Sequence, residues 1–320
     1  MIHRFSAYGL AVESNVALPG VAGDASVGAA DVVLRLAESD RLQMAALPGE
    51  RAWYVSPDRD DQDVPWLTVW RGDGFRFVYG EGAEFCVGLD GSAVDGSWRV
   101  PLTLADAASY VLGPVLAFAL RLRGVVPLHA GAVAAGGAAL LFAGPAGAGK
   151  SSTVAAIGAL GHAVLSDDVV PLRVTPDAIV AAAGFPRVSV WDDTASAIFR
   201  RAPRNLPAWS ASYGKRCIDL LDHGFRFCEQ SLPIGAIYLL QPWGEQDRQV
   251  RRLPAREALL ALAANTYGGY LLDRRMREVE FDVLGAVARQ VPVSALRFDG
   301  DLSRLLDSCA ALLASRLAGD

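Results

Sequence analysis

A glycine-rich segment near the middle of the chain has the residue types and the spacing of a phosphate-binding loop. Residues 144–151, GPAGAGKS, match the pattern G-x-x-x-x-G-K-[ST] at every position, and a second serine follows. Triphosphate oxygens in such a loop meet a ring of backbone N–H groups, so side chains must be missing where the backbone curls. The residues expected to bind a nucleotide are Gly144, Ala146, Gly147, Ala148, Gly149, Lys150, Ser151 and Ser152.

Lys150 and Ser151 carry the charged and metal-binding chemistry of this loop. The Lys150 ammonium would reach the β- and γ-phosphates, and the Ser151 hydroxyl would be a ligand of Mg²⁺. The elements that the loop requires are also predicted. The apolar run 138–143 is typical of a strand, and the small-residue stretch 151–160 is typical of a helix whose N-terminal N–H groups favour an anion. The pattern alone leaves open whether the nucleotide is a fuel, a switch or a phosphoryl donor.

Two adjacent carboxylates, Asp167 and Asp168, follow one helix and one short strand after the glycine loop. A strand beside the one that leads into the loop would bring them to the edge of the sheet where the phosphates bind. Neighbouring side chains on a strand point to different sides, so one carboxylate could face the metal and the other an incoming hydroxyl. A carboxylate beside that hydroxyl can accept its proton. The alternative is a polar Ser-Asp-Asp turn with solvated acids.

His129 is a third candidate, in the segment 126–130, one strand ahead of the glycine loop. A single histidine in an apolar run is commonly a core residue whose hydrogen bonds are satisfied. It can also orient or tune a catalytic carboxylate. We therefore consider His129 as a possible partner of Asp167.

The positioning elements divide into a β-rich part, residues 1–100, and a mixed part, residues 101–320, with the composition changing between residues 100 and 125. The first part has short, partly alternating segments separated by glycine and aspartate turns, which predict a small antiparallel module. The second part begins with an apolar helix over 103–123, with Thr103 as its N-cap, and continues with strands and helices. The pattern predicts an α/β core with a small β-rich N-terminal domain, α+β overall.

The composition excludes several classes of protein. With 52% hydrophobic and 20% charged residues, the 320-residue chain is expected to fold around a large core. A net charge of −5 argues against a nucleic-acid partner held by phosphate-backbone contacts. The four cysteines lack metal-ligand spacing, and the N-terminus lacks the features of a signal peptide. We expect a cytoplasmic protein with no membrane partner, and a homo-oligomer remains an open possibility.

These residues together resemble the C-terminal domain of HPr kinase/phosphorylase and its kinase-like relatives. The shared pattern is a histidine with a small residue, a strand, the glycine loop, a small helix, a Gly-His turn and a hydrophobic strand ending in paired aspartates. It is most specific over residues 125–172 and weaker through 185–187 and 233–238. The N-terminal hundred residues resemble those of HPr-kinase-like proteins encoded with peptide-modification clusters such as lasso-peptide pathways.

The resemblance implies a P-loop kinase core of the HPr kinase/phosphoenolpyruvate carboxykinase type that uses ATP and Mg²⁺. By position, Lys150 would bind the phosphates, while Ser151 and Asp168 would lie at the metal. Asp167 would be the general base toward the acceptor, and His129 would orient it. The implied reaction transfers the γ-phosphoryl group to a hydroxyl, with a serine of a peptide or small protein as the acceptor. A small-molecule kinase and a nucleotide-binding regulator without catalysis are the alternatives.

The chain departs from the second signature of that family, a glutamate-bearing strand that leads to Arg-Gly-Leu-Gly. The corresponding segment is 183–190, AGFPRVSV, which lacks both the glutamate and the part tied to dephosphorylation. We therefore expect neither HPr as the substrate nor a phosphorylase reaction. Arg187 and Lys215 are candidate cations for a phosphate or for the substrate. The sequence does not decide between ATP and GTP, because no base-reading motif is evident.

Overall fold

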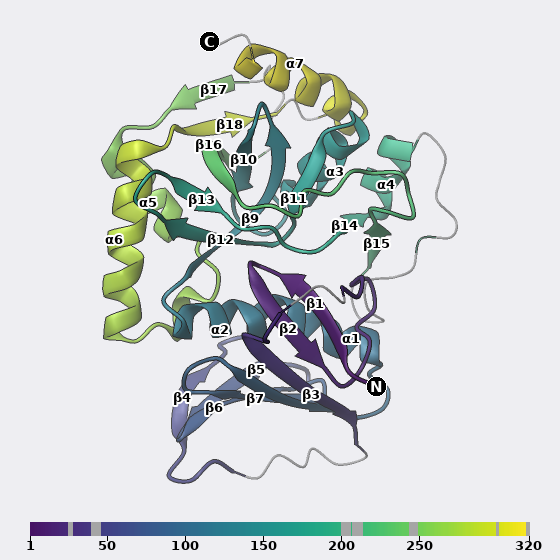
Figure 1. The fold of residues 1–320 in the computed structure, drawn as a ribbon, viewed down its shortest axis with the longest axis vertical. Helices are drawn as coiled ribbons and strands as arrows, with labels where there is room; N and C mark the ends of the chain where they lie inside the picture. Colours follow the sequence, from purple (N-terminus) through teal and green to yellow (C-terminus); the bar gives the residue numbers. More distant parts are fainter. Residues whose placement is uncertain are drawn as a thin grey trace. The chain divides into compact units, whose positions relative to one another are not determined.

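The computed structural model describes residues 1–24, 28–39, 46–199, 206, 214–242, 249–298 and 301–317. The chain forms two compact units, whose elements are labelled in Figure 1. Unit 1 comprises Met1–Val125 and Gly268–Met276, and unit 2 comprises Val126–Tyr267 and Arg277–Asp320. The boundary expected from the sequence, at residue 100, lies before the apolar helix, whereas this helix belongs to unit 1 in the structure.

Within the described residues, unit 1 contains an eight-stranded sheet with the strand order β1-β2-β3-β8-β7-β6-β5-β4. The strands are β1 (His3–Ala7), β2 (Leu10–Ser14), β3 (Val32–Glu38), β4 (Arg51–Val55), β5 (Leu67–Arg71), β6 (Gly74–Tyr79), β7 (Ala83–Gly88) and β8 (Ala93–Trp98). Most neighbours are antiparallel, but β3 is parallel to both β2 and β8. The expectation of a purely antiparallel module is therefore wrong at this strand. The connection from Ser14 to Val32 is long enough for the crossover that a parallel pair requires.

A long apolar helix packs against the sheet of unit 1. Its segments are α1 (Leu104–Tyr110), the π-helical turn η1 (Val111–Val115) and α2 (Leu116–Leu122). Thr103 caps the helix through a capping box with Asp106, as the sequence predicts. The Phe118 ring makes edge contacts with Phe75 and Phe77 of β6. Among the described residues this one helix is long and apolar enough to cross a membrane, and 78% of its apolar 18-residue window is buried inside the protein.

Unit 2 is built on a second sheet, which has eight strands in the described residues: β10-β9-β12-β13-β16-β18-β17, with β11 beside β9. The strands are β9 (Val126–Ala135), β10 (Ala138–Ala143), β11 (Ala163–Ser166), β12 (Val169–Val174), β13 (Ile179–Ala181), β16 (Leu232–Leu240), β17 (Gln249–Arg252) and β18 (Val293–Arg297). β10 also pairs with β16, and the pairs β10–β16 and β16–β18 are both parallel. The carboxyl ends of these three strands therefore meet at one edge of the sheet, where open α/β sheets bind ligands.

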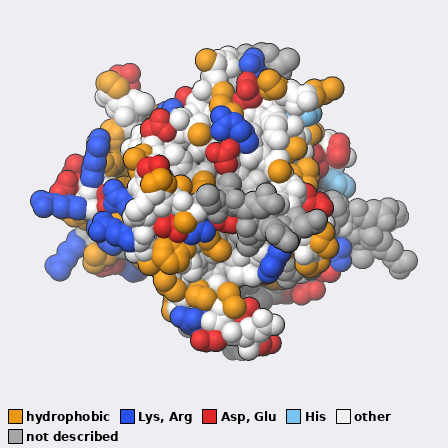
Figure 2. All heavy atoms as spheres, turned by 90° about the horizontal axis from the view of Figure 1, so that it is seen from below, with side chains coloured by type: hydrophobic (Ala, Val, Ile, Leu, Met, Phe, Trp, Pro, Cys, Tyr) orange, Lys and Arg blue, Asp and Glu red, His pale blue; other side chains and the backbone are white. Residues whose placement is uncertain are grey.

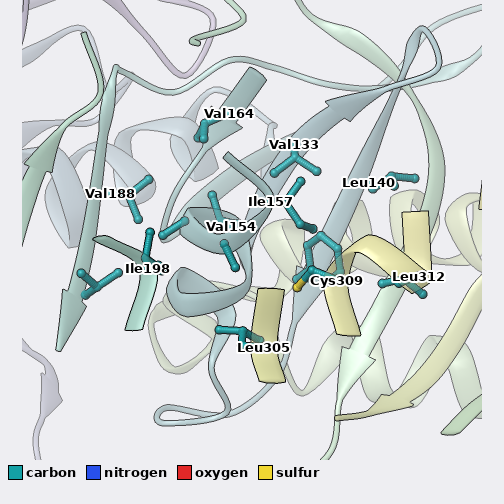
Figure 3. Packing of buried hydrophobic residues seen from close by; sticks show 14 of the residues in the cluster. Val133, Leu140, Val154, Ile157, Val164, Val188, Ile198, Leu305, Cys309 and Leu312 are labelled. Atoms are coloured by element: carbon teal, nitrogen blue, oxygen red, sulfur yellow. The ribbon is translucent and has the colours of Figure 1, made fainter. Parts of the chain in front are cut away.

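Helices cover both faces of this sheet (Figure 1). They are α3 (Lys150–Ala159), α4 (Asp192–Phe199), α5 (Ala255–Ala263), α6 (Arg274–Gln290) and α7 (Leu305–Leu317); the short 3-10 turns are η2 (Gly269–Leu271) in unit 1 and η3 (Leu302–Arg304). Side chains alternate along β10, so that Leu140 and Phe142 join a core with α3, α4 and α7, while Leu141 joins a core with α5 and α6. Figure 3 shows Ile157 of α3 and Val133 of β9 among the side chains of the first core.

A separate two-stranded ribbon, β14 (Arg187–Trp191) and β15 (Lys215–Asp219), completes this side of unit 2. Val188 and Val190 of β14 and Ile218 of β15 are buried in the core that contains α3. The opposite face of the ribbon therefore presents the alternate residues of each strand, which are mostly polar.

The described chain is a mixed α/β protein with large sheets, which is the fold class that the sequence predicts. On the face drawn in Figure 2, several Lys and Arg side chains gather toward the left of the view, with acidic side chains near them.

Candidate functional site

The glycine loop connects β10 directly to α3 at the edge of the sheet in unit 2. Gly147 and Gly149 have φ values of 79° and 92°, in the left-handed region that favours glycine. A Cβ atom on Gly144 would lie 3.1 Å from the Leu240 carbonyl oxygen and 3.2 Å from the Ala148 Cβ. No side chain caps α3 at Gly149, so its first N–H groups face the loop. The backbone thus forms a cradle of the kind that binds an anion.

Lys150 lies beneath this loop and is 8% exposed. Its Nζ donates hydrogen bonds to the carbonyl oxygens of Gly144, at 2.8 Å, and Pro145, at 3.0 Å. Burial lowers the pKa of Lys150, and the negative charges of Asp168 and Asp167 oppose that shift. The two aspartates, which lie between β11 and β12, therefore favour the protonated form of the lysine at the centre of the loop.

Ser152 is the loop residue whose side chain turns away from the cradle. Its Oγ lies 3.0 Å from the Thr194 hydroxyl of α4, and both residues are buried. The hydroxyl of Ser152 thus joins α3 to α4, and only the backbone N–H of this residue is left for a bound anion.

Asp167 directly follows β11, and its carboxylate is hydrogen-bonded to the backbone of β14. Its Oδ2 accepts a hydrogen bond from the Ser189 backbone N–H at 3.0 Å, while its Oδ1 is buried and has no hydrogen-bond partner in the described residues. Burial raises the pKa of Asp167, and the Ser189 N–H and the Ser151 hydroxyl oppose the shift. A Cβ on Gly131 of β9 would lie 3.6 Å from this Oδ1.

Asp168 has a different environment, because its backbone adopts the left-handed conformation with a φ of 69°. The Nδ1 atom of His129 lies 3.1 Å from both the carbonyl oxygen and the Oδ1 of Asp168. Burial, the largest influence, raises the pKa of Asp168, but the hydrogen bond and charge of His129 outweigh it and hold this pKa below its usual value. The side chains of Asp168 and His129 are 44% and 30% exposed.

The structure therefore corrects the expected partner of His129. The histidine contacts Asp168, whereas the sequence reasoning assigned it to Asp167. The cause is the strand register: Val169 of β12 pairs directly with His129 of β9, and the turn at Asp168 directs its carboxylate toward the histidine.

The ribbon supplies the other side of the site. Ser189 lies opposite Cys217, and Trp191 lies opposite Lys215, whose Nζ is 5.6 Å from the Trp191 ring centroid. Burial is the largest influence on the pKa values of Asp167, Asp168 and Lys150. The positive charge of Lys215 is a smaller influence, and it lowers all three pKa values. Lys215 thus belongs to the same group of charges.

Arg187 is the predicted cation that the structure places in the interior. It is 6% exposed, and its guanidinium carbon lies 5.2 Å from the Phe185 ring centroid. Burial raises the pKa of the Cys217 thiol, and the charge and hydrogen bond of Arg187 oppose this shift. Of the two candidate substrate cations, Lys215 is therefore the accessible one.

Sequence reasoning missed Ser189 and Gly131. Ser189 acts through its backbone N–H, which leaves no signature in the residue type. Gly131 could have been noticed as a glycine inside a strand, which often marks close approach of another group.

The oxygen donors in this site fit Mg²⁺ only if a bound phosphate supplies some of the ligands of the metal. The described residues contain no group of three His, Cys, Asp or Glu side chains that could hold a metal on their own. Mg²⁺ is commonly bound by one or two protein oxygens, substrate phosphates and waters. The Ser151 hydroxyl and the unpartnered Oδ1 of Asp167 are oxygen donors of this type beside the cradle.

Comparison with known proteins gives a distant structural relative. No family model matches the chain, and no curated protein matches it. Among solved structures, the HPr(Ser) kinase/phosphatase from Coxiella burnetii is similar over 60% of this chain and 99% of its own, with 14% sequence identity and a TM-score of 0.33. This is a distant structural relationship, and the argument for function below rests on the residues of the site.

Proposed function

We propose that this chain is a kinase that transfers the γ-phosphoryl group of ATP, bound with Mg²⁺, to a hydroxyl group. The acceptor that we favour is a serine of a peptide or small protein. The observation that carries the proposal is the cradle of residues 144–151 with Lys150 inside it. Two carboxylates in the turn between β11 and β12 lie close enough for their negative charges to favour the protonated form of this lysine. Phosphoryl transfer depends on positioning and on electrostatic stabilisation, and this group of residues supplies both.

The loop and Lys150 would bind the donor. The backbone N–H groups at the start of α3 would donate to the phosphate oxygens, and the Lys150 ammonium would exchange its bonds with the Gly144 and Pro145 carbonyls for phosphate oxygens. Ser151 and Asp167, whose side chains are hydrogen-bonded to each other, would hold Mg²⁺. The metal, when bound, would neutralise charge that develops on the phosphates.

The contact of His129 with Asp168 favours a division of roles opposite to the one expected from the sequence. An acceptor hydroxyl must reach the base within hydrogen-bonding distance, and geometry takes precedence over pKa in choosing it. The Asp168 side chain is 44% exposed, whereas the Asp167 Oδ1 is buried. We therefore assign Asp168 as the proton acceptor, with His129 as the residue that positions it, and Asp167 to the metal side.

The exposure of the acidic pair supports a large acceptor. Within the described residues, the side chains of Asp168 and His129 are partly exposed, so a hydroxyl carried on a peptide could approach them from solvent. A small-molecule kinase would be expected to surround its acceptor with a closed pocket at this position.

The proposal is tested by incubating the protein with γ-labelled ATP, Mg²⁺ and candidate acceptors, which include serine peptides and small hydroxyl compounds. We expect label on a peptide serine with the wild type and its loss with Asp168→Asn. Tight ATP binding without transfer to any acceptor would contradict the kinase and favour a regulator.

A further inference from the structure

A cavity lies against the glycine loop. Its volume is about 230 Å³, and its wall includes Gly144 and Pro145 of the loop. The rest of the wall comes from the end of β16, from β17 and β18, and from α5, all within unit 2. Clefts that enclose whole drug-sized ligands measure about 300–1,000 Å³. This cavity is therefore too small for a whole ligand of that kind, but it could hold one part of a ligand whose other part lies outside the cavity.

The lining combines apolar walls with a few polar groups. Leu239, Ala261 and Ala295 provide apolar surface. The amides of Gln241 and Asn265, together with the ion pair of Arg251 and Glu257, provide the polar groups of the wall. Sites for small organic ligands have this character, in which apolar walls hold a flat body and a few polar groups orient it. A bound inorganic ion alone would gain little from the apolar walls.

The topology puts the loop between the cavity and the acids. β10 leads into the loop, its parallel neighbour β16 leads to the cavity, and its other neighbour β9 pairs with the strands that flank Asp167 and Asp168. A phosphate chain whose terminal group faces the acids therefore has its opposite end directed toward the β16 side. Gly144 and Pro145, whose carbonyls bind Lys150, border the cavity.

From this arrangement we infer that the cavity binds the nucleoside of a nucleoside triphosphate whose phosphates lie in the glycine loop. The inference rests on the proposed function for the phosphate part and adds the site that recognises the base and sugar. The sequence offered no base-reading motif, because the lining residues come from separate elements and only the fold brings them together.

The test compares two probes, ATP and inorganic triphosphate, by isothermal titration calorimetry with Mg²⁺ present. Ala261→Phe would fill the cavity from α5. We expect it to weaken ATP binding at least about tenfold, while triphosphate binding changes less than about twofold, since a side chain in the cavity excludes only the nucleoside. GTP and CTP in parallel titrations would rank the bases.

Ala263→Phe is the matched control, because this exposed alanine lies on the same helix outside the cavity and should leave both affinities unchanged. Ala295→Phe provides a second filled cavity if Ala261→Phe melts well below the wild type. Unchanged ATP binding by a folded cavity variant would overturn the nucleoside site, as would equal wild-type affinity for ATP and triphosphate. Failure of the wild type to bind either probe would instead overturn the proposed function and the nucleoside site with it.

Discussion

The Nδ1 atom of His129 lies 3.1 Å from the Oδ1 of Asp168, and this contact joins β9 to the turn between β11 and β12. The contact lowers the pKa of Asp168 against the raising effect of burial, and the Asp168 side chain is reachable from solvent. Asp167 instead accepts a hydrogen bond from the Ser189 backbone N–H. The two adjacent acids therefore have different surroundings, and the predictions below separate them.

Asp168→Asn should lower the rate of phosphoryl transfer by about 10²- to 10⁴-fold, the range for loss of a general base. Nucleotide affinity should change little, because Lys150 is the residue that we propose binds the phosphates. Single-turnover transfer and a separate binding titration measure the two effects. His129→Gln should lower transfer less and should change its pH profile, as expected for a positioning residue. Wild-type transfer rates in Asp168→Asn would remove this residue from the mechanism.

Asp167→Asn should stabilise the protein at neutral pH while it weakens Mg²⁺-dependent nucleotide binding. Burial raises the folded-state pKa of Asp167, so the folded protein binds this proton more tightly than the unfolded chain does. The resulting stabilisation is present below the unfolded pKa of about 3.9 and is lost as pH rises toward the folded value. The variant cannot lose it, so it is expected to be more stable than the wild type at pH 7. Denaturant unfolding at pH 4 and pH 7 provides the measurement, and a variant that is less stable at pH 7 would contradict the argument.

Lys150→Ala should reduce nucleotide affinity by more than about 100-fold, because it removes the cation at the centre of the cradle. Ser152→Ala serves as the matched control from the same turn of α3. Its hydroxyl bonds Thr194 and not the loop, so its loss should cost about 1 kcal/mol of stability and leave affinity nearly unchanged. Equal losses of affinity in the two variants would indicate a general disturbance of α3.

Lys215→Ala should lower the transfer rate by about 10²-fold with a smaller effect on ATP binding, since a cation on the acidic side would act on charge that develops during transfer. Arg216→Ala is the control from the adjacent position. Arg216 forms an exposed ion pair with Asp192 at 2.6 Å, which contributes little to stability. Comparison of kcat and KM for the two variants tests the role of Lys215, and matching kinetics would refute it.

The local parts of the candidate site could be predicted from the sequence, because they are short and continuous. The strand 138–143, the glycine loop and the following helix are β10, the cradle and α3 in the structure, with helix ends shifted by one residue. The strand ending at Ser166 is also present as β11. Glycine spacing and hydrophobic runs encode such segments directly.

The relationships between distant segments could not be predicted in this way. Which aspartate meets His129 depends on the pairing of β9 with β12 and on one left-handed residue, and neither leaves a pattern in the sequence. The parallel pairing of β3 in unit 1 was missed for a similar reason, because alternation of side chains is the same in parallel and antiparallel strands.

Gly131 has a consequence for the dimensions of the site. A methyl group at this position would lie 2.4 Å from the Val154 Cγ2 atom of α3 and 3.6 Å from the Asp167 Oδ1. The hydrogen atom that stands there instead lets the helix rest directly on the sheet, with Lys150 and Ser151 at its first turn. The distance between β9 and α3 is therefore limited at this point by the contact of the Val154 side chain with Gly131, and a single added methyl group would push the helix away from the sheet.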